Sequence, residues 1–116
     1  MNTIIPIEMY HTQIDLRIVK SARRCMKGIM LKHKCKYKEK EESRGLVWMY
    51  SSDKYYLILN VNFLTHGVVA HEVEHIRAYI VEHAGSAEVD CSYLVEYITD
   101  RIYAFLELRN VRVKSG

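Results

Sequence analysis

The chain has 116 residues, of which 49% are hydrophobic and 27% are charged, a composition that excludes disordered and fibrous proteins. One domain spanning residues 1–116 is expected, because a chain of this length supports a single hydrophobic core. The net charge of +3 is too small to require a nucleic-acid partner, and no run approaches the roughly 18 apolar residues of a membrane span. We therefore expect neither nucleic acid nor a membrane as the main partner.

The three cysteines, Cys25, Cys35 and Cys91, are odd in number and widely spaced, and no C-x-x-C pair occurs. This pattern indicates neither a disulfide framework nor a zinc ribbon. A reducing compartment fits it best. The first residues also lack the basic and apolar regions of a secretory signal. The sequence therefore predicts a cytoplasmic protein.

The first half of the chain predicts a strand, a helix and a hairpin. Polar and apolar residues alternate over residues 13–19, which is the period of a half-buried strand, and Pro6 restricts the preceding stretch to a sheet edge or a lead-in. Ser21 is placed to cap a helix that follows it. Two aromatic and partly β-branched runs, residues 46–50 and 55–61, flank the turn residues S-S-D-K and predict a β-hairpin.

A lysine-rich segment, residues 32–40, separates the predicted helix from the hairpin. Its lysines could contact phosphates, but the adjoining Glu39, Glu41 and Glu42 would repel them. The sequence therefore favours a solvated loop, and a nucleic-acid-binding module ranks below the functions described next.

The most specific pattern lies in residues 67–75, where His71, Glu72 and His75 spell H-E-x-x-H. Thr65 is placed to cap a helix over this stretch. Residues four apart on a helix lie one above the other, so the two imidazoles can hold one metal ion with Glu72 beside it. Zinc binds neutral imidazole nitrogens, and a catalytic site keeps one position for a water whose proton a carboxylate can take. The predicted cofactor is Zn²⁺, with His71 and His75 as ligands and Glu72 as the catalytic base.

Two histidines do not complete a catalytic zinc site, and the last predicted helix supplies the candidates for a third ligand. We expect the motif helix to end at Gly85 and the last helix to begin with Ser86 as its N-cap. Antiparallel packing of the two helices would bring acidic residues of the second near the first. Asp90 ranks first among them, and Glu88 and Glu96 remain open as alternatives.

The H-E-x-x-H pattern, a glycine-containing turn, an acidic residue and the tyrosine-bearing helix Y-L-V-E-Y-I-T-D at residues 93–100 resemble the small zincin-like metallopeptidases encoded by bacteriophages and related mobile elements. The likeness in element order covers most of the chain, and it is specific only at residues 67–100. It implies a minimal gluzincin-like protein in which both motif histidines and a Glu of the following helix bind zinc. At the position of that Glu this chain has Val89, flanked by Glu88 and Asp90.

Together these patterns predict an α+β fold, in which a small sheet built in the order strand, helix, strand, strand packs against the H-E-x-x-H helix and a C-terminal helix. Residues 111–116 are expected to form a frayed tail. The predicted function is a zinc-dependent metallopeptidase or amide hydrolase of phage or mobile-element type, acting on a protein or peptide substrate. The alternative is a catalytically inactive zincin-like structural or interaction protein, such as a virion component that contacts other virion proteins. A phage-encoded protein would act in the cytoplasm of the bacterial host or on the virion.

Overall fold

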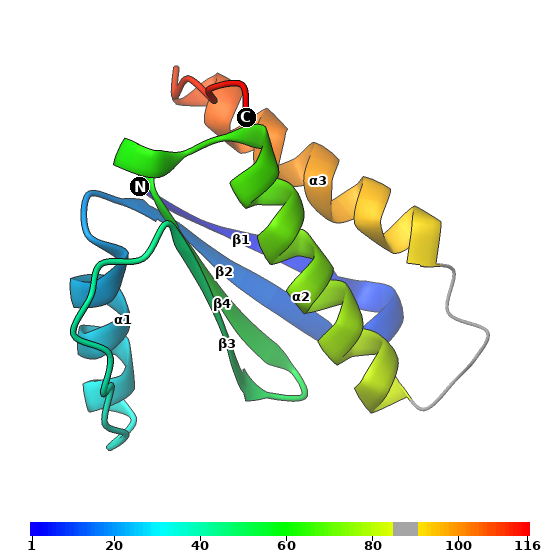
Figure 1. Cartoon of the computed structure of the whole chain (residues 1–116). Helices are drawn as coiled ribbons and strands as arrows, with labels where there is room; N and C mark the ends of the chain where they lie inside the picture. The colour runs from blue at the N-terminus through cyan, green and yellow to red at the C-terminus, as the bar shows by residue number, and fades with distance from the viewer. Residues whose placement is uncertain (85–90) are drawn as a thin grey trace.

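The computed structural model describes residues 1–84 and 91–116, and within these ranges it contains one four-stranded sheet and three helices (Figure 1). The strands are β1 (Asn2–Ile7), β2 (Thr12–Val19), β3 (Gly45–Ser51) and β4 (Lys54–Asn60). The helices are α1 (Ala22–Lys32), α2 (His66–Ala84) and α3 (Cys91–Leu108), and two short 3-10 turns, η1 (Glu8–Tyr10) and η2 (Val61–Phe63), follow β1 and β4. The predicted α+β class is confirmed.

The sheet is mixed, with the strand order β1-β2-β4-β3. β1 and β3 pair antiparallel with their neighbours, whereas β2 and β4 in the centre run parallel. The expected order of strand, helix, strand, strand was one strand short, because the chain turns back at η1 and the lead-in before residue 12 becomes the separate strand β1. Pro6 lies in this strand at the edge of the sheet, where a residue without an N–H is tolerated.

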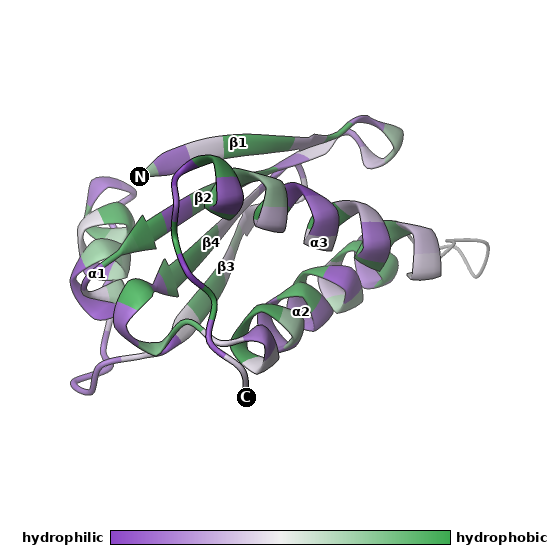
Figure 2. Ribbon diagram, turned by 90° about the horizontal axis from the view of Figure 1, so that it is seen from above, coloured by the Kyte–Doolittle hydropathy of each residue, from purple (hydrophilic) through white to green (hydrophobic). Residues whose placement is uncertain are grey.

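Helices cover both faces of the sheet, with α1 on one side and α2 and α3 on the other (Figure 2). The central strand β4 is buried almost throughout and shows how the faces divide. Its residues Tyr55, Leu57 and Leu59 join the larger core beneath α2 and α3, and Tyr56 and Ile58 join a smaller core beneath α1. Because both faces of β4 are covered, its sequence is nearly continuously apolar.

Helices α1 and α2 begin at the predicted capping residues. The Ser21 hydroxyl accepts a hydrogen bond from the Arg24 N–H at 3.2 Å, and the Thr65 hydroxyl accepts one from the Val68 N–H at 3.1 Å. The predicted Gly85 helix end and Ser86 cap lie outside the described residues. Within residues 1–84 and 91–116, no helix has both the length and the apolar character needed to cross a membrane.

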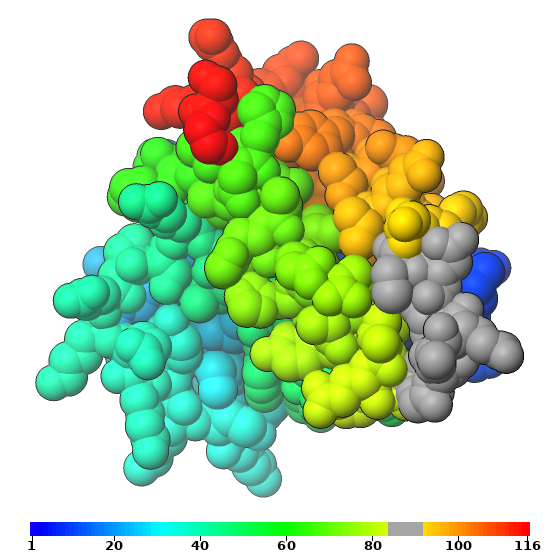
Figure 3. Space-filling model, turned by 45° about the vertical axis from the view of Figure 1, so that its right-hand side comes forward, coloured from blue at the N-terminus to red at the C-terminus, as the bar shows by residue number. Residues whose placement is uncertain are grey.

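The C-terminal segment is not frayed, contrary to the prediction from the sequence. The first N–H groups of a helix have no partner within the helix, and those of His66 and Gly67 donate instead to the carbonyls of Lys114 and Gly116, at 3.1 and 2.7 Å. The Lys114 N–H in turn donates to the Leu64 carbonyl at 3.0 Å. Figure 3 shows the segment, coloured red, seated against the start of α2. These hydrogen bonds order the tail beside the beginning of the motif helix.

Candidate metal centre

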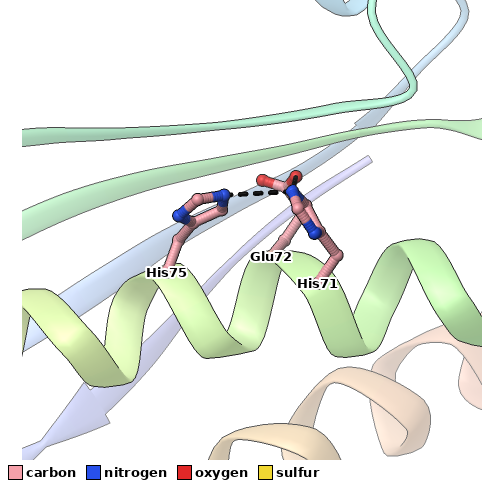
Figure 4. A group of neighbouring side chains, drawn as sticks. All are labelled: His71, Glu72 and His75. Atoms are coloured by element: carbon pink, nitrogen blue, oxygen red, sulfur yellow. Dashed lines mark hydrogen bonds and ion pairs between the residues drawn. The ribbon is translucent and has the colours of Figure 1, made fainter.

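Helix α2 is oriented by a buried apolar stripe. Val69, Val73, Ile76 and Ile80 are almost fully buried against the larger core, at the spacing that places side chains on one face of a helix. This face packs against the sheet and α3. The H-E-x-x-H residues therefore lie on the side of α2 that is directed towards β3. Figure 4 shows all three motif side chains projecting from α2 towards the strands.

The two motif histidines converge. The Nε2 atoms of His71 and His75 are 3.0 Å apart, and the ring planes are nearly perpendicular, at 87°. A tetrahedral zinc ion with Zn–N distances of about 2.0–2.1 Å separates two imidazole nitrogens by about 3.3 Å. The rings therefore need to move apart by only a few tenths of an ångström to bind one ion. The His71 side chain is 68% exposed, so it is free to make this adjustment.

Glu72 is the buried member of the cluster, with 6% of its surface exposed. Its Oε1 atom lies 4.0 Å from His71 Nε2, and the ligand atoms of the three residues all lie within 4.8 Å of one another. Burial raises the pKa of Glu72, and the neighbouring His71 and His75 act in the opposite direction. The carboxylate therefore lies where it can exchange a proton with a molecule held beside the two imidazoles.

Gly45, the first residue of β3, forms the wall behind Glu72. A Cβ atom at this position would lie 2.9 Å from Cγ and 3.2 Å from Cδ of Glu72, so only glycine allows the strand and the carboxylate to come this close. Sequence reasoning did not assign Gly45 to the site. Its only local signal was a glycine at the start of a strand, which can indicate the close approach of another group.

An open pocket of about 480 Å³ adjoins the cluster. It lies between the start of α2 and the start of β3, and its walls include His71, Glu72, Arg44 and Gly45. Arg44 is the only permanently charged cation among the residues that line it. The pocket is large enough to admit a segment of extended chain next to the histidines.

The third ligand predicted from the last helix is not found among the described residues. Glu96 is exposed on α3 and does not belong to the His71, Glu72 and His75 group, which is the only such cluster in residues 1–84 and 91–116. In Figure 4 the motif side chains point away from the neighbouring helix and towards the strands, which explains why Glu96 does not reach them. Asp90, the first choice, and Glu88 lie outside the described residues. The structure thus brings together His71, Glu72 and His75, and it does not bring Glu96 to them.

Comparisons of this chain with protein-family models, with curated proteins and with solved structures find no match in any of the three. The chemistry of the site is therefore inferred from its own residues. Two imidazoles beside a buried carboxylate fit a zinc ion better than Mg²⁺ or Ca²⁺, which prefer sites made of oxygen ligands.

Proposed function

We propose that this chain is a zinc-dependent peptidase or amide hydrolase, with His71 and His75 as metal ligands and Glu72 as the general base. One observation carries the proposal: two imidazole nitrogens lie 3.0 Å apart beside a carboxylate that is almost fully buried. In a solvated helix with two incidental histidines, the acidic residue between them would be expected at the surface, because burying an unpaired carboxylate costs free energy. The zincin-like resemblance and an origin in a phage or mobile element belong to the same proposal.

Bound zinc would supply Lewis acidity towards the scissile carbonyl and the attacking water. Glu72 takes a proton from that water and passes it to the leaving amine. The backbone at Gly45 packs against the side chain of Glu72 and limits the positions that its carboxylate can take. Proton transfer by a positioned side chain of this kind contributes roughly 10²- to 10⁴-fold to the rate.

A protein or peptide is the substrate class that fits the surroundings of the site. β3 is the outer strand of the sheet beside α2, and one of its edges, which pairs with no other strand in residues 1–84 and 91–116, leads away from the pocket at Gly45. An extended peptide can bind such an edge by main-chain hydrogen bonds. Arg44, which lines the same pocket, adds a positive charge to the site.

The second candidate function is a zincin-like protein without turnover that acts as a structural or interaction protein, for example in a virion. It is favoured by the lack of a third protein ligand among the described residues. The hydrolase requires bound metal, whereas the structural or interaction protein does not.

The proposed test compares Glu72→Gln with Glu74→Gln. Glu74 lies two residues away on the same helix, but it is exposed and paired with Arg77 at 2.8 Å, so its replacement changes the charge equally without touching the site. Zinc is measured by elemental analysis, and hydrolysis is measured with a peptide library prepared from a proteome digest.

We expect one zinc per chain in the wild type and in both variants, and a loss of hydrolysis of at least about 100-fold in Glu72→Gln alone. A wild type that binds zinc but cleaves no peptide would favour the inactive alternative. A wild type that binds no zinc would exclude the hydrolase and leave only a binding or structural role.

A further inference from the structure

The charges of the chain are divided between the two faces of the sheet. Residues 20–43, which include α1 and most of the segment leading to β3, contain nine Lys or Arg residues and three Glu residues, a net charge of +6. The remaining residues contain eight basic and eleven acidic ones, a net charge of −3. Because α1 lies on the face opposite to α2 and α3, the modest total of +3 results from a strongly basic face and a mildly acidic remainder (Figure 2).

A row of lysines lies along the segment that follows α1. Lys34, Lys36 and Lys38 are exposed, and the residues between them, Cys35 and Tyr37, are half-buried. Tyr37 packs against the smaller core under α1, which holds the segment to the protein. Lys34 has a left-handed backbone conformation with φ 59°, so the chain turns there before it continues through Lys36 and Lys38. The three exposed ammonium groups can contact neighbouring phosphates of one strand.

One of the three glutamates is held at the start of α1, where its charge is partly offset by the positive end of the helix dipole. The Glu42 carboxylate accepts hydrogen bonds from the Ser21 hydroxyl at 2.6 Å and from the Arg23 N–H at 3.0 Å, at the start of α1. These bonds lower the pKa of Glu42 to about 2. Glu42 keeps its negative charge, but its hydrogen bonds direct the carboxylate to the start of α1.

An exposed aromatic ring lies at the beginning of the lysine row. The His33 ring, between Lys32 and Lys34, is 4.1 Å from the Tyr50 ring, and Tyr50 is 45% exposed. Trp48 supports Tyr50 from the side, at 5.5 Å between ring centroids. A tyrosine held in this way can stack on a nucleobase, and stacking does not depend on the base sequence.

From the charge, the exposed lysines and the supported ring, we infer that the face formed by residues 20–43 and Tyr50 binds single-stranded nucleic acid. The lysines contact phosphates and Tyr50 stacks on a base. Single strands are favoured over duplex because stacking on Tyr50 requires an unpaired base. This inference is independent of the metal site on α2.

The test measures the fluorescence anisotropy of a labelled oligothymidylate of about 20 nucleotides, bound by the full chain at about 50 mM salt. The variant Lys34→Gln, Lys36→Gln, Lys38→Gln should raise Kd by at least about tenfold and lower the slope of log Kd against log salt by about 2. The control variant removes the same charge from exposed arginines outside the basic face, by Arg101→Gln, Arg109→Gln, Arg112→Gln. It should change Kd by less than about twofold, since these arginines do not lie along the lysine row. Thermal unfolding of every variant verifies that it is folded.

Tyr50→Leu separates nucleic acid from other polyanions. It should weaken binding of the oligonucleotide by about fivefold or more and leave binding of heparin, which has no bases, unchanged. The inference is overturned if the wild type does not bind the oligonucleotide, or if the two triple variants lose the same affinity. It is also overturned if Tyr50→Leu leaves oligonucleotide binding unchanged, or if only vesicles of anionic lipid are bound.

Discussion

Gly45→Ala tests whether the backbone of β3 positions the proposed catalytic base. The added methyl group would lie 2.9 Å from Cγ and 3.2 Å from Cδ of Glu72, and 3.4 Å from Cδ2 of Leu59. Carbon atoms in normal contact are about 3.5–4.0 Å apart, so the Glu72 side chain has to move by roughly 0.5–1 Å. Leu59 is fully buried and cannot move aside, whereas Glu72 borders the open pocket and is the side chain that shifts.

Crowding of this kind destabilises a protein by about 1–3 kcal/mol, which corresponds to a fall in Tm of about 4–12 °C for a domain of this size. A displacement of about 1 Å in a catalytic group lowers the rate by about 100-fold. We expect Gly45→Ala to lose both stability and hydrolysis while it keeps its zinc, because the three atoms nearest to the new methyl group belong to Glu72 and Leu59. Circular dichroism, elemental analysis and the peptide assay measure the three quantities.

Gly28→Ala is the matched control, since a Cβ atom at Gly28 would meet nothing within 4 Å. Gly28 lies inside α1, where alanine is the better helix former, so this variant should gain about 0.5–1 kcal/mol and keep full activity. A Gly45→Ala protein with the Tm and the activity of the wild type would refute the view that this glycine is needed for the position of Glu72.

Two further predictions concern pH and metal. The pKa of Glu42 in the folded protein is about 2, below its ordinary value of 4.5, so the unfolded chain takes up the proton first as the pH falls. Glu42 therefore stabilises the fold above about pH 4.5, and this contribution is lost as the pH falls towards 2. Because the carboxylate is exposed, Glu42→Gln should cost only about 0.5–1 kcal/mol at pH 7, and thermal scans should show the variant and the wild type converging near pH 2. Zinc at 100 times its Kd should stabilise the wild type by about 2.7 kcal/mol, an effect seen in scans with and without a chelator. His71→Ala should abolish that gain, while His83→Ala, on the same helix and hydrogen-bonded to the Tyr79 carbonyl, should retain it; equal gains in both variants would exclude the motif as the zinc site.

Local signals in the sequence predicted most of the elements. Ser21 and Thr65 cap helices because a side-chain oxygen followed by a helical pattern is a signal confined to a few neighbouring residues. The hairpin was also predicted from a local signal, because turn residues between two β-prone runs determine the conformation of only a few neighbouring residues. The convergence of His71 and His75 also follows from helix geometry alone, because residues four apart on a helix share a face.

These local signals could not predict contacts between residues that are distant in the sequence. The pairing of β1 with β2 depends on a turn at η1, which has neither Gly nor a typical turn sequence. The tail at Lys114 is held by backbone groups at the start of α2, and backbone hydrogen bonds carry no residue signature. The third ligand was predicted on the last helix because that helix follows the motif helix in the chain. The direction of the motif side chains depends instead on how α2 packs, which the order of the elements does not specify.

The position of α2 and the identity of its possible metal ligands are local properties, because the helix repeat and the side-chain chemistry each involve only neighbouring residues. The side of α2 that faces the sheet depends on packing, and so do the burial of Glu72 against Gly45 and the separation of Glu96 from the histidines. Packing also places the basic residues of α1 and the following segment on the face opposite to α2, since the total charge of a chain does not specify where its charges lie. Burial and charge clustering both arise from contacts between segments that are remote in sequence, which no local pattern contains.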